Sequence, residues 1–329
     1  MATAEQIKAL IKSHAEGDDA RFFAVAMQMA AQAARQGKSR FAEELKELVD
    51  RAKSDQAGSR HRTKPVPMVQ PRGELSGLLS ASYPSTRLPE MVLDEPVRTK
   101  LERVVLEHRQ QERLRAHGLA PRRKLLLVGP PGTGKTMSAA ALAGELHFPL
   151  FTILLHGLMT KFMGETAAKL RLIFDAISET RAVYLFDEFD AVGGDRSAEN
   201  DVGEIRRVLN SFLQFLEQDD SESLIVAATN HPQLLDRALW RRFDDVIRFE
   251  LPSPGLAVET MKSRLAPFDT KDLRWDELAN ECQGLSYADI VSACEHTAKV
   301  AVLDERTLIR PDELAIALRD RAAPQMGRS

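Results

Sequence analysis

The residues with the clearest chemistry form a glycine-rich segment, GPPGTGKT, at positions 129–136. It fits the pattern G-x-x-x-x-G-K-[ST], in which successive backbone N–H groups converge on phosphate oxygens. Glycines let the backbone bend closely around an anion, Lys135 can reach the β- and γ-phosphates, and the Thr136 hydroxyl can ligate Mg²⁺. The segment therefore predicts a nucleoside triphosphate site formed by Gly129, Pro130, Pro131, Gly132, Thr133, Gly134, Lys135 and Thr136.

Two acidic residues, Asp187 and Glu188, directly follow the apolar run AVYLF. Alone, this pattern fits the end of any strand. Beside a phosphate-binding segment it predicts chemistry, because ligands of parallel sheets bind at the carboxyl ends of the strands. Asp187 would hold Mg²⁺ through its water shell, and Glu188 would orient and deprotonate the attacking water. The pair therefore predicts hydrolysis of ATP with Mg²⁺ rather than nucleotide binding alone.

The elements that must position these residues are short strands that alternate with helices. The apolar runs KLLLVG, LFTILL, AVYLFD and LIVAAT are too brief for helices, and a helical pattern follows each of them. This alternation favours βαβ units and a mainly parallel sheet. The glycine-rich segment follows one run and opens a helix, whose N-terminus favours phosphate. We expect an α/β, P-loop nucleotide-hydrolysing domain at 91–254, followed by four helices at 255–329.

The first 90 residues have a different pattern. Apolar positions at helical spacing predict a small helical bundle at 1–53, which we interpret as a docking module; a purely structural appendage is the alternative. Residues 54–90 lack sustained periodicity and predict a linker. Its second part, GELSGLLSASYP, has enough apolar residues to pack on a neighbour.

Composition restricts the classes of partner and compartment. Lys and Arg number 45 against 48 Asp and Glu, a net charge of −3. The net charge therefore gives no support for a nucleic acid or another anionic polymer as a partner. The two cysteines, Cys282 and Cys294, lack C-x-x-C spacing and fit a reducing compartment. The N-terminus lacks the apolar core of a signal peptide, and no apolar run approaches the ~20 residues of a spanning helix. We expect a cytoplasmic protein without membrane insertion.

The stretch LIVAATNHPQLLDRALWRRFDDVIRFELP resembles the segment that identifies AAA ATPases of the AAA+ superfamily. The paired arginines are most similar to the clade of ESCRT-disassembling and microtubule-severing ATPases, and the resemblance covers about 91–329. It implies that Asn230 positions water against the γ-phosphate. It also implies that Arg241 and Arg242 act on ATP bound by the adjoining subunit of an ATP-dependent homo-hexamer. Surface ion pairs with Asp244 and Asp245 are the structural alternative for these arginines.

KFMGET is similar to the pore loop of the same clade, which implies that Lys161, Phe162, Met163 and Gly164 face an axial channel and grip an extended polypeptide. Most relatives in the clade have Trp where this chain has Phe162. Without the resemblance, a phenylalanine at this position is more often a core residue.

GLSYADI resembles the G-x-S-G-A-D segment of the family's small helical lid domain. The resemblance implies that Gly284 and Ala288 approach the adenine and ribose. Tyr287 stands where the family has its second glycine.

Three functions follow as hypotheses. The first is a ring-forming ATPase that threads or remodels a polypeptide. The second is a nucleotide-controlled module that switches a partner without translocation. The third, a DNA or RNA remodeller, is disfavoured by the neutral charge and the lack of a basic aromatic groove.

The layout also resembles bacterial ATPases that are encoded beside a subtilisin-like serine protease and are associated with plasmid competition and antiviral (phage) defence. Such a protease is therefore a candidate partner.

Overall fold

The structure is a computed structural model, and it describes residues 70–158, 163–189, 201–234 and 240–326. All of these residues belong to one compact unit, Val69–Ser329. The predicted helical bundle at 1–53 lies outside the described residues. No helix in the described ranges is long and apolar enough to cross a membrane.

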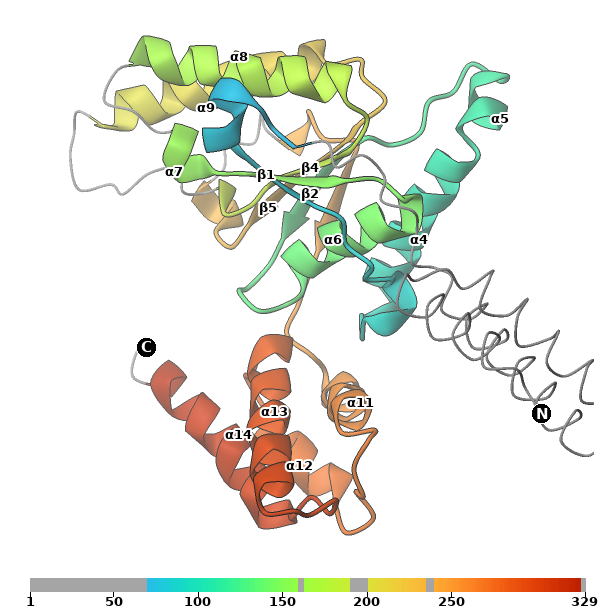
Figure 1. The fold of residues 1–329 in the computed structure, drawn as a ribbon, viewed down its shortest axis with the longest axis vertical. Helices are drawn as coiled ribbons and strands as arrows, with labels where there is room; N and C mark the ends of the chain where they lie inside the picture. The colour runs from blue at the N-terminus through green and yellow to red at the C-terminus, as the bar shows by residue number, and fades with distance from the viewer. Residues whose placement is uncertain (1–69, 159–162, 190–200, 235–239, 327–329) are drawn as a thin grey trace, which may run out of the picture. The chain divides into compact units, whose positions relative to one another are not determined.

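A mostly parallel sheet organises the first part of this unit (Figure 1). Five of its strands are parallel and one edge strand, β1, runs antiparallel to β3. This confirms the expected α/β fold. In spatial order, the strands of this sheet are β1 (Leu79–Ser82), β3 (Leu150–Ile153), β4 (Val183–Phe186), β5 (Leu224–Thr229), β2 (Lys124–Val128) and β6 (Asp245–Arg248).

β1 lies within the segment 54–90 that the sequence predicts to be a linker. Leu79 of β1 is buried, and Leu79 to Ser82 pair with Ile153 to Leu150 of β3. The linker interpretation therefore does not hold at 79–82. A four-residue strand is too short to show a period, and its neighbour β3 is distant in the sequence.

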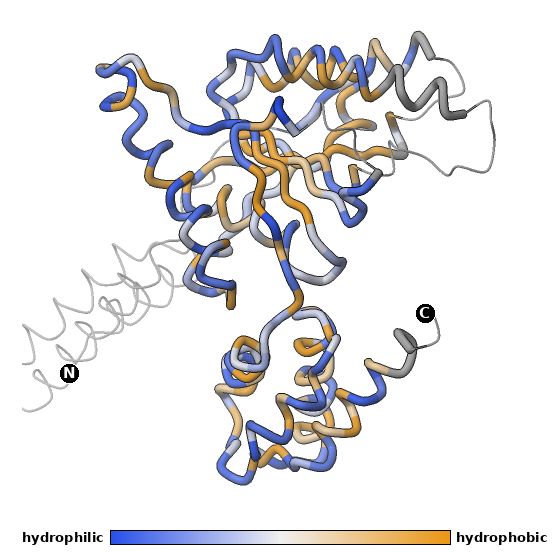
Figure 2. Tube along the Cα trace, turned by 180° about the vertical axis from the view of Figure 1, so that it is seen from behind, coloured by the Kyte–Doolittle hydropathy of each residue, from blue (hydrophilic) through white to orange (hydrophobic). Residues whose placement is uncertain are grey.

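Helices cover both faces of the sheet, so the central strands are apolar throughout rather than alternating. All residues of β4 and β5 are buried. Along β4, Tyr184 and Phe186 contribute to the core on one face, whereas Val183 and Leu185 contribute to the other. Figure 2 shows the resulting concentration of hydrophobic residues in the strands of the sheet.

The first core packs under α8 (Met163–Glu179) and α9 (Asp201–Gln218), and the second under α4 (Glu95–Arg109) and α6 (Lys135–Leu146). Figure 1 shows these two pairs of helices on opposite faces of the sheet. Shorter elements complete this part: η1 (Gly73–Gly77), η2 (Leu88–Glu90), α5 (Gln111–Arg115), α7 (Leu155–Leu158) and η4 (Pro232–Leu234).

The sheet is followed by helices with a core of their own, which includes Met261, Ile290 and Leu314. Their starts carry the expected signals: Ser253 caps the first of them, and Ser286 forms a capping box with Asp289 at the third. In chain order the helices are α11 (Pro254–Arg264), α12 (Trp275–Glu281), α13 (Tyr287–Leu303) and α14 (Pro311–Met326).

Candidate active site

The glycine-rich segment connects the end of β2 to the start of α6, as its sequence context predicts. Gly132 and Gly134 adopt φ values of 74° and 97°, a left-handed conformation that favours glycine. Lys135 is only 6% exposed, and its Nζ donates to the carbonyl oxygens of Gly129 at 2.8 Å and Pro130 at 2.7 Å. The loop therefore holds an ammonium group at the N-terminus of a helix, which is a suitable site for phosphate.

Gly132 also lies against the start of α13. Its carbonyl oxygen accepts a 3.1 Å hydrogen bond from the N–H of Ala288. A Cβ atom added to Gly132 would lie 2.4 Å from Ser286 Oγ and 3.1 Å from the Ala288 Cβ. The glycine is therefore required by close approach as well as by backbone conformation, and it joins the phosphate loop to the C-terminal helices.

Asp187 and Glu188 follow β4 at the edge of the sheet that carries the loop. Thr136 Oγ1 donates to Asp187 Oδ2 at 2.7 Å, so the two oxygen groups expected to hold Mg²⁺ lie together. Oxygen donors beside a buried ammonium group fit a magnesium–nucleotide complex, because Mg²⁺ prefers oxygen ligands. Thr136 and Asp187 would hold the metal, which would supply charge neutralisation at the phosphates.

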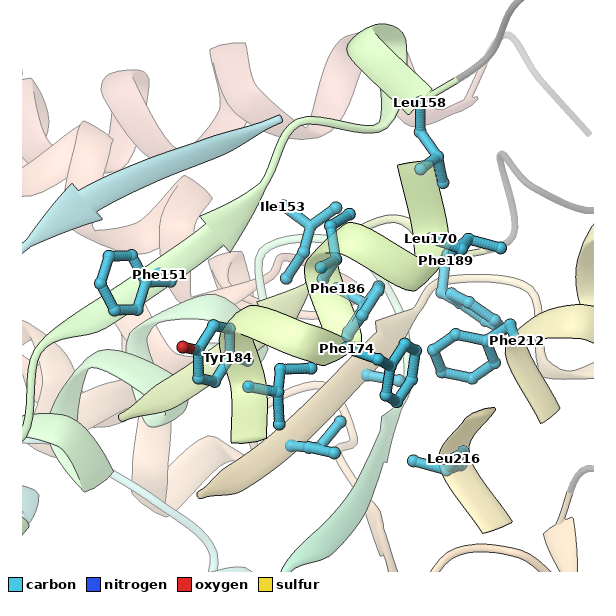
Figure 3. Close-up of a cluster of buried hydrophobic side chains, with 14 of the residues drawn as sticks. Phe151, Ile153, Leu158, Leu170, Phe174, Tyr184, Phe186, Phe189, Phe212 and Leu216 are labelled. Carbon is cyan, nitrogen blue, oxygen red and sulfur yellow. The ribbon is translucent and has the colours of Figure 1, made fainter. Parts of the chain in front are cut away.

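Glu188 is one of the non-glycine residues with positive φ, at 49°. Such a conformation costs on the order of 1–3 kcal/mol and persists only when its surroundings enforce it. Here the Glu188 N–H donates to Asp187 Oδ1 at 3.0 Å, and the next residue, Phe189, is 1% exposed. The Phe189 ring lies 4.6 Å from the ring of Phe212 and packs edge-on against Phe186 (Figure 3). This aromatic cluster anchors the turn and leaves the Glu188 carboxylate exposed.

A cavity of about 430 Å³ brings the predicted residues together. Lys135 and Thr136 come from the start of α6, Glu188 from the end of β4, and Asn230 from the end of β5. The helices α11 and α13 supply the other wall. The predicted site residues that line the cavity are Pro131, Gly132, Gly134, Lys135, Thr136, Asp187, Glu188, Asn230 and Ala288.

A family model described as "ATPase family associated with various cellular activities (AAA)" matches residues 125–251. An uncharacterized AAA family ATPase of Sinorhizobium fredii, y4kL, is 35% identical over 228 residues, which are 69% of this chain and 68% of the relative. The chain belongs to the AAA family of ATPases. It is an ATP-hydrolysing enzyme that uses ATP with Mg²⁺.

Two further similarities are to AAA proteins whose names refer to proteolysis. The ATP-dependent zinc metalloprotease FtsH of Helicobacter pylori is 31% identical over 256 residues, or 75% of this chain and 40% of that protein. The proteasome-activating nucleotidase of Methanococcus maripaludis is 32% identical over 234 residues, or 69% of this chain and 57% of that protein. This AAA chain thus spans about half the length of these two relatives.

Arg241 and Arg242 do not line the cavity of their own chain. Arg242 pairs with Glu217 of α9, and Arg241 is exposed without an ion pair to any described residue. The expected alternative partners are engaged elsewhere. Asp244 accepts from the backbone N–H groups of Arg123 and Lys124, and Asp245 pairs with Lys100 and Arg122.

Two further predictions differ in their relation to the structure. Gly284 is exposed, has a φ of 81° and does not line the cavity, so its position indicates a turn before α13. Lys161 and Phe162 lie outside the described residues, and Met163 and Gly164 begin α8. The assignment of these four residues to a pore loop stays a prediction.

Sequence reasoning did not find Arg264 or Val291, which also line the cavity. Neither belongs to a motif, so no signal identified them. Tyr287 lines the cavity as well, and a partial signal exists for it, because this residue departs from the glycine of the resembling segment.

Proposed function

We propose that this AAA ATPase assembles as an ATP-dependent homo-hexameric ring and couples hydrolysis to threading or remodelling of a polypeptide. The observation that carries the proposal is the separation of Arg241 and Arg242 from the cavity that gathers the other predicted catalytic groups. Residues that act on ATP from outside their own site must act on a neighbouring copy. Closed rings of identical subunits repeat such a head-to-tail contact.

Packed aromatic residues flank Arg241 and Arg242 on both sides. Trp240 packs against the first core, and Phe243 is 7% exposed. Arg248 of β6 places its guanidinium 5.5 Å from the centre of the Trp240 ring. The two arginines lie between these anchors, next to β6 at the edge of the sheet. A planar guanidinium in trans can neutralise charge that develops on the transferred phosphoryl group.

The placement of the side chains supports the following roles within one subunit. Lys135 binds phosphate oxygens, Thr136 and Asp187 hold the metal, and Asn230 orients the water. Glu188, fixed by its turn, takes the proton from that water. Arg241 and Arg242 of the next subunit then stabilise the negative charge of the transition state. Arginines with this role generally increase the rate of phosphoryl transfer by about 10³–10⁵-fold.

The domain roles are part of the proposal. We assign 91–254 to the large ATPase domain, α11–α14 within 255–329 to a small lid domain, and 1–53 to a docking domain. The hydrogen bond between Gly132 and Ala288 supports the lid assignment, because it links the phosphate loop directly to α13. A nucleotide bound there would couple the two domains.

The first test is the double variant Arg241→Ala/Arg242→Ala. We expect ATP hydrolysis to fall by about 10³-fold or more while ATP binding persists. Wild-type specific activity should rise with protein concentration as rings form. Normal hydrolysis by the double variant, independent of protein concentration, would contradict the ring.

Polypeptide handling is supported by the resemblance of KFMGET to a pore loop and by the names of the relatives, one a protease and one a proteasome-activating nucleotidase. Phe162→Ala tests it. Using a permanently unfolded protein as probe, we expect basal ATP hydrolysis to persist and stimulation by the probe to disappear. Unchanged stimulation would contradict threading and favour the switch hypothesis.

A subtilisin-like serine protease in a bacterial defence or plasmid-competition system stays a prediction based on overall layout. The variant Glu188→Gln should bind ATP without turnover and hold its complexes together. Co-purification of a protease with this variant, and not with Lys135→Ala, would support the pairing. Its absence from both preparations would contradict it.

A further inference from the structure

The residue that directly precedes Asn230 is a buried threonine. Thr229 is the last residue of β5, and the five strand residues before it, Leu224 to Ala228, are all apolar. The Thr229 side chain is nevertheless fully buried, with 0% of the residue exposed. Because a buried hydroxyl is stable only with hydrogen-bond partners, these partners indicate what Thr229 does at the end of the strand.

The hydroxyl of Thr229 constrains the turn that carries Asn230. Its Oγ1 accepts a hydrogen bond of 3.0 Å from the backbone N–H of His231. This bond spans Asn230, as in turns where a threonine hydroxyl binds the backbone two residues ahead. Asn230 is half-buried and lines the active-site cavity. The Thr229 hydroxyl therefore limits the directions in which the Asn230 side chain can leave the strand.

The backbone of Thr229 binds the phosphate loop. In the parallel ladder of β2 and β5, Thr229 lies beside Val128, the last residue before the loop. Its carbonyl oxygen accepts a hydrogen bond of 3.3 Å from the N–H of Gly129. The carbonyl oxygen of Gly129 in turn accepts from Lys135 Nζ. Thr229 thus contacts the first residue of the loop through its backbone and the Asn230 turn through its side chain.

We propose that Thr229 is a positioning residue for ATP hydrolysis, which fixes the Asn230 side chain relative to the phosphate loop. The inference rests on the proposed role of Asn230 in orienting the attacking water. Thr229 is fully buried and is not among the residues that line the cavity, so it acts on the water only through Asn230. Such a restraint matters because misplacement of a catalytic group by about 1 Å can lower the rate by about 10²-fold.

The test is steady-state phosphate release by the full chain with ATP and Mg²⁺, at a protein concentration at which wild-type specific activity no longer rises. Thr229→Val removes the hydroxyl but retains the branched shape and the backbone bond to Gly129. We expect kcat to fall by about 10- to 10²-fold and the KM for ATP to change by no more than about twofold, because the restraint acts in the transition state. Thr229→Ser retains the hydroxyl and should recover most of the loss. An unchanged kcat in Thr229→Val, or no recovery in Thr229→Ser, would overturn the proposal.

Ser223→Ala is the matched control for a loss of stability, because Ser223 directly precedes β5 at its other end and is also 0% exposed. Its Oγ donates to the carbonyl oxygen of Ile177 at 2.9 Å and accepts from the N–H of Ala182 at 3.3 Å. Both variants lose a buried hydroxyl, so both should unfold at lower urea concentration than the wild type. Only Thr229→Val should lose kcat. Equal losses of kcat at equal folded fractions would indicate a purely structural hydroxyl and overturn the proposal.

Asn230→Ala separates this inference from the proposed role of Asn230. Alone, it should lower kcat by about 10²–10³-fold, the scale for removal of one preorganised polar group from a transition state. Adding Thr229→Val to Asn230→Ala should lower kcat no further, because the effects of residues that act through one another do not add. A further loss as large as that of Thr229→Val alone would overturn the positioning role and leave the role of Asn230 intact. Normal turnover by Asn230→Ala would instead overturn the role of Asn230, and this inference with it.

Discussion

The active-site cavity has two walls that are built differently. On the sheet wall, each predicted group is fixed by a neighbour: Lys135 by the loop carbonyls and Thr136 by Asp187. Glu188 is held by the buried Phe189 that follows it. On the helical wall, Arg264 and Tyr287 have no hydrogen-bond partner among the described residues. A backbone hydrogen bond from Ala288 to Gly132 joins the two walls.

We interpret this difference as a division of roles, in which the sheet wall carries the chemistry and the helical wall binds the substrate. Groups that act on the reacting atoms must be held in place before the reaction, because reorganisation would raise the barrier. Groups that hold the substrate can move with it. The sheet wall meets the first requirement through packing of the aromatic cluster (Figure 3). The helical wall is joined to the loop by the hydrogen bond from Ala288 to Gly132.

The largest expected effect is the loss of hydrolysis on the sheet wall. Glu188→Gln removes the proposed general base, and we expect ATP turnover to fall by about 10²–10⁴-fold with little change in ATP affinity. Steady-state phosphate release and calorimetric ATP binding measure the two quantities. Glu295→Gln, at an exposed position of α13, is the control and should turn over normally. An equal loss of binding and turnover would contradict the assigned role.

The next effect tests the junction between the walls. Gly132→Ala places a Cβ against Ser286 at a φ of 74°, whereas Gly118→Ala has a φ of 72° and no neighbour within 4 Å. Both variants have the backbone penalty of roughly 1–2 kcal/mol, but only Gly132→Ala must displace α13. We expect greater destabilisation in urea and loss of ATP hydrolysis for Gly132→Ala alone. Equal behaviour would contradict a tight junction.

The part of the chain that contains the sheet and the C-terminal helices α11–α14 differ in how burial shifts the pKa of their buried groups. Burial on α4 lowers the pKa of His108, whose Nε2 lies 2.8 Å from the Arg122 carbonyl oxygen. Below about pH 6.5 the unfolded chain takes up a proton that the folded chain does not, so stability falls as pH decreases. In the C-terminal helices, burial raises the pKa of Cys282 to about 11 and that of Cys294 to about 12. Both thiols therefore stay protonated at acidic and neutral pH.

Urea unfolding between pH 7.5 and 5.5 measures this effect. His108→Gln should reduce the slope of stability against pH, by no more than about 1.4 kcal/mol per pH unit. The same slope in His108→Gln as in the wild type would place the proton uptake elsewhere.

The smallest effect concerns Gly284, which the resemblance places near the base and the structure places in an exposed turn. Gly284→Ala should cost roughly 1–2 kcal/mol of stability through its positive φ. Nucleotide affinity should remain unchanged, because nothing lies within 4 Å of the added Cβ. An increase in the Kd of ATP would show that the helical wall extends to this turn.

The sheet wall was predictable because its residues occur in short motifs whose spacing reflects a strand, a loop and a helix start. The glycine-rich segment and the acids Asp187 and Glu188 lie where their sequence context predicts. Arg264 was not predictable, because its position depends on how α11 packs. The same is true of Asp245, whose partners Lys100 and Arg122 are more than a hundred residues away in the chain.

The most direct test of the central claim is complementation between two inactive variants. Glu188→Gln subunits retain Arg241 and Arg242, whereas Arg241→Ala/Arg242→Ala subunits retain an intact cavity. If the arginines act on the neighbouring subunit, mixing the two should restore ATP hydrolysis well above the sum of the separate activities. A mixture no more active than that sum, under conditions in which the two variants co-assemble, would contradict the account.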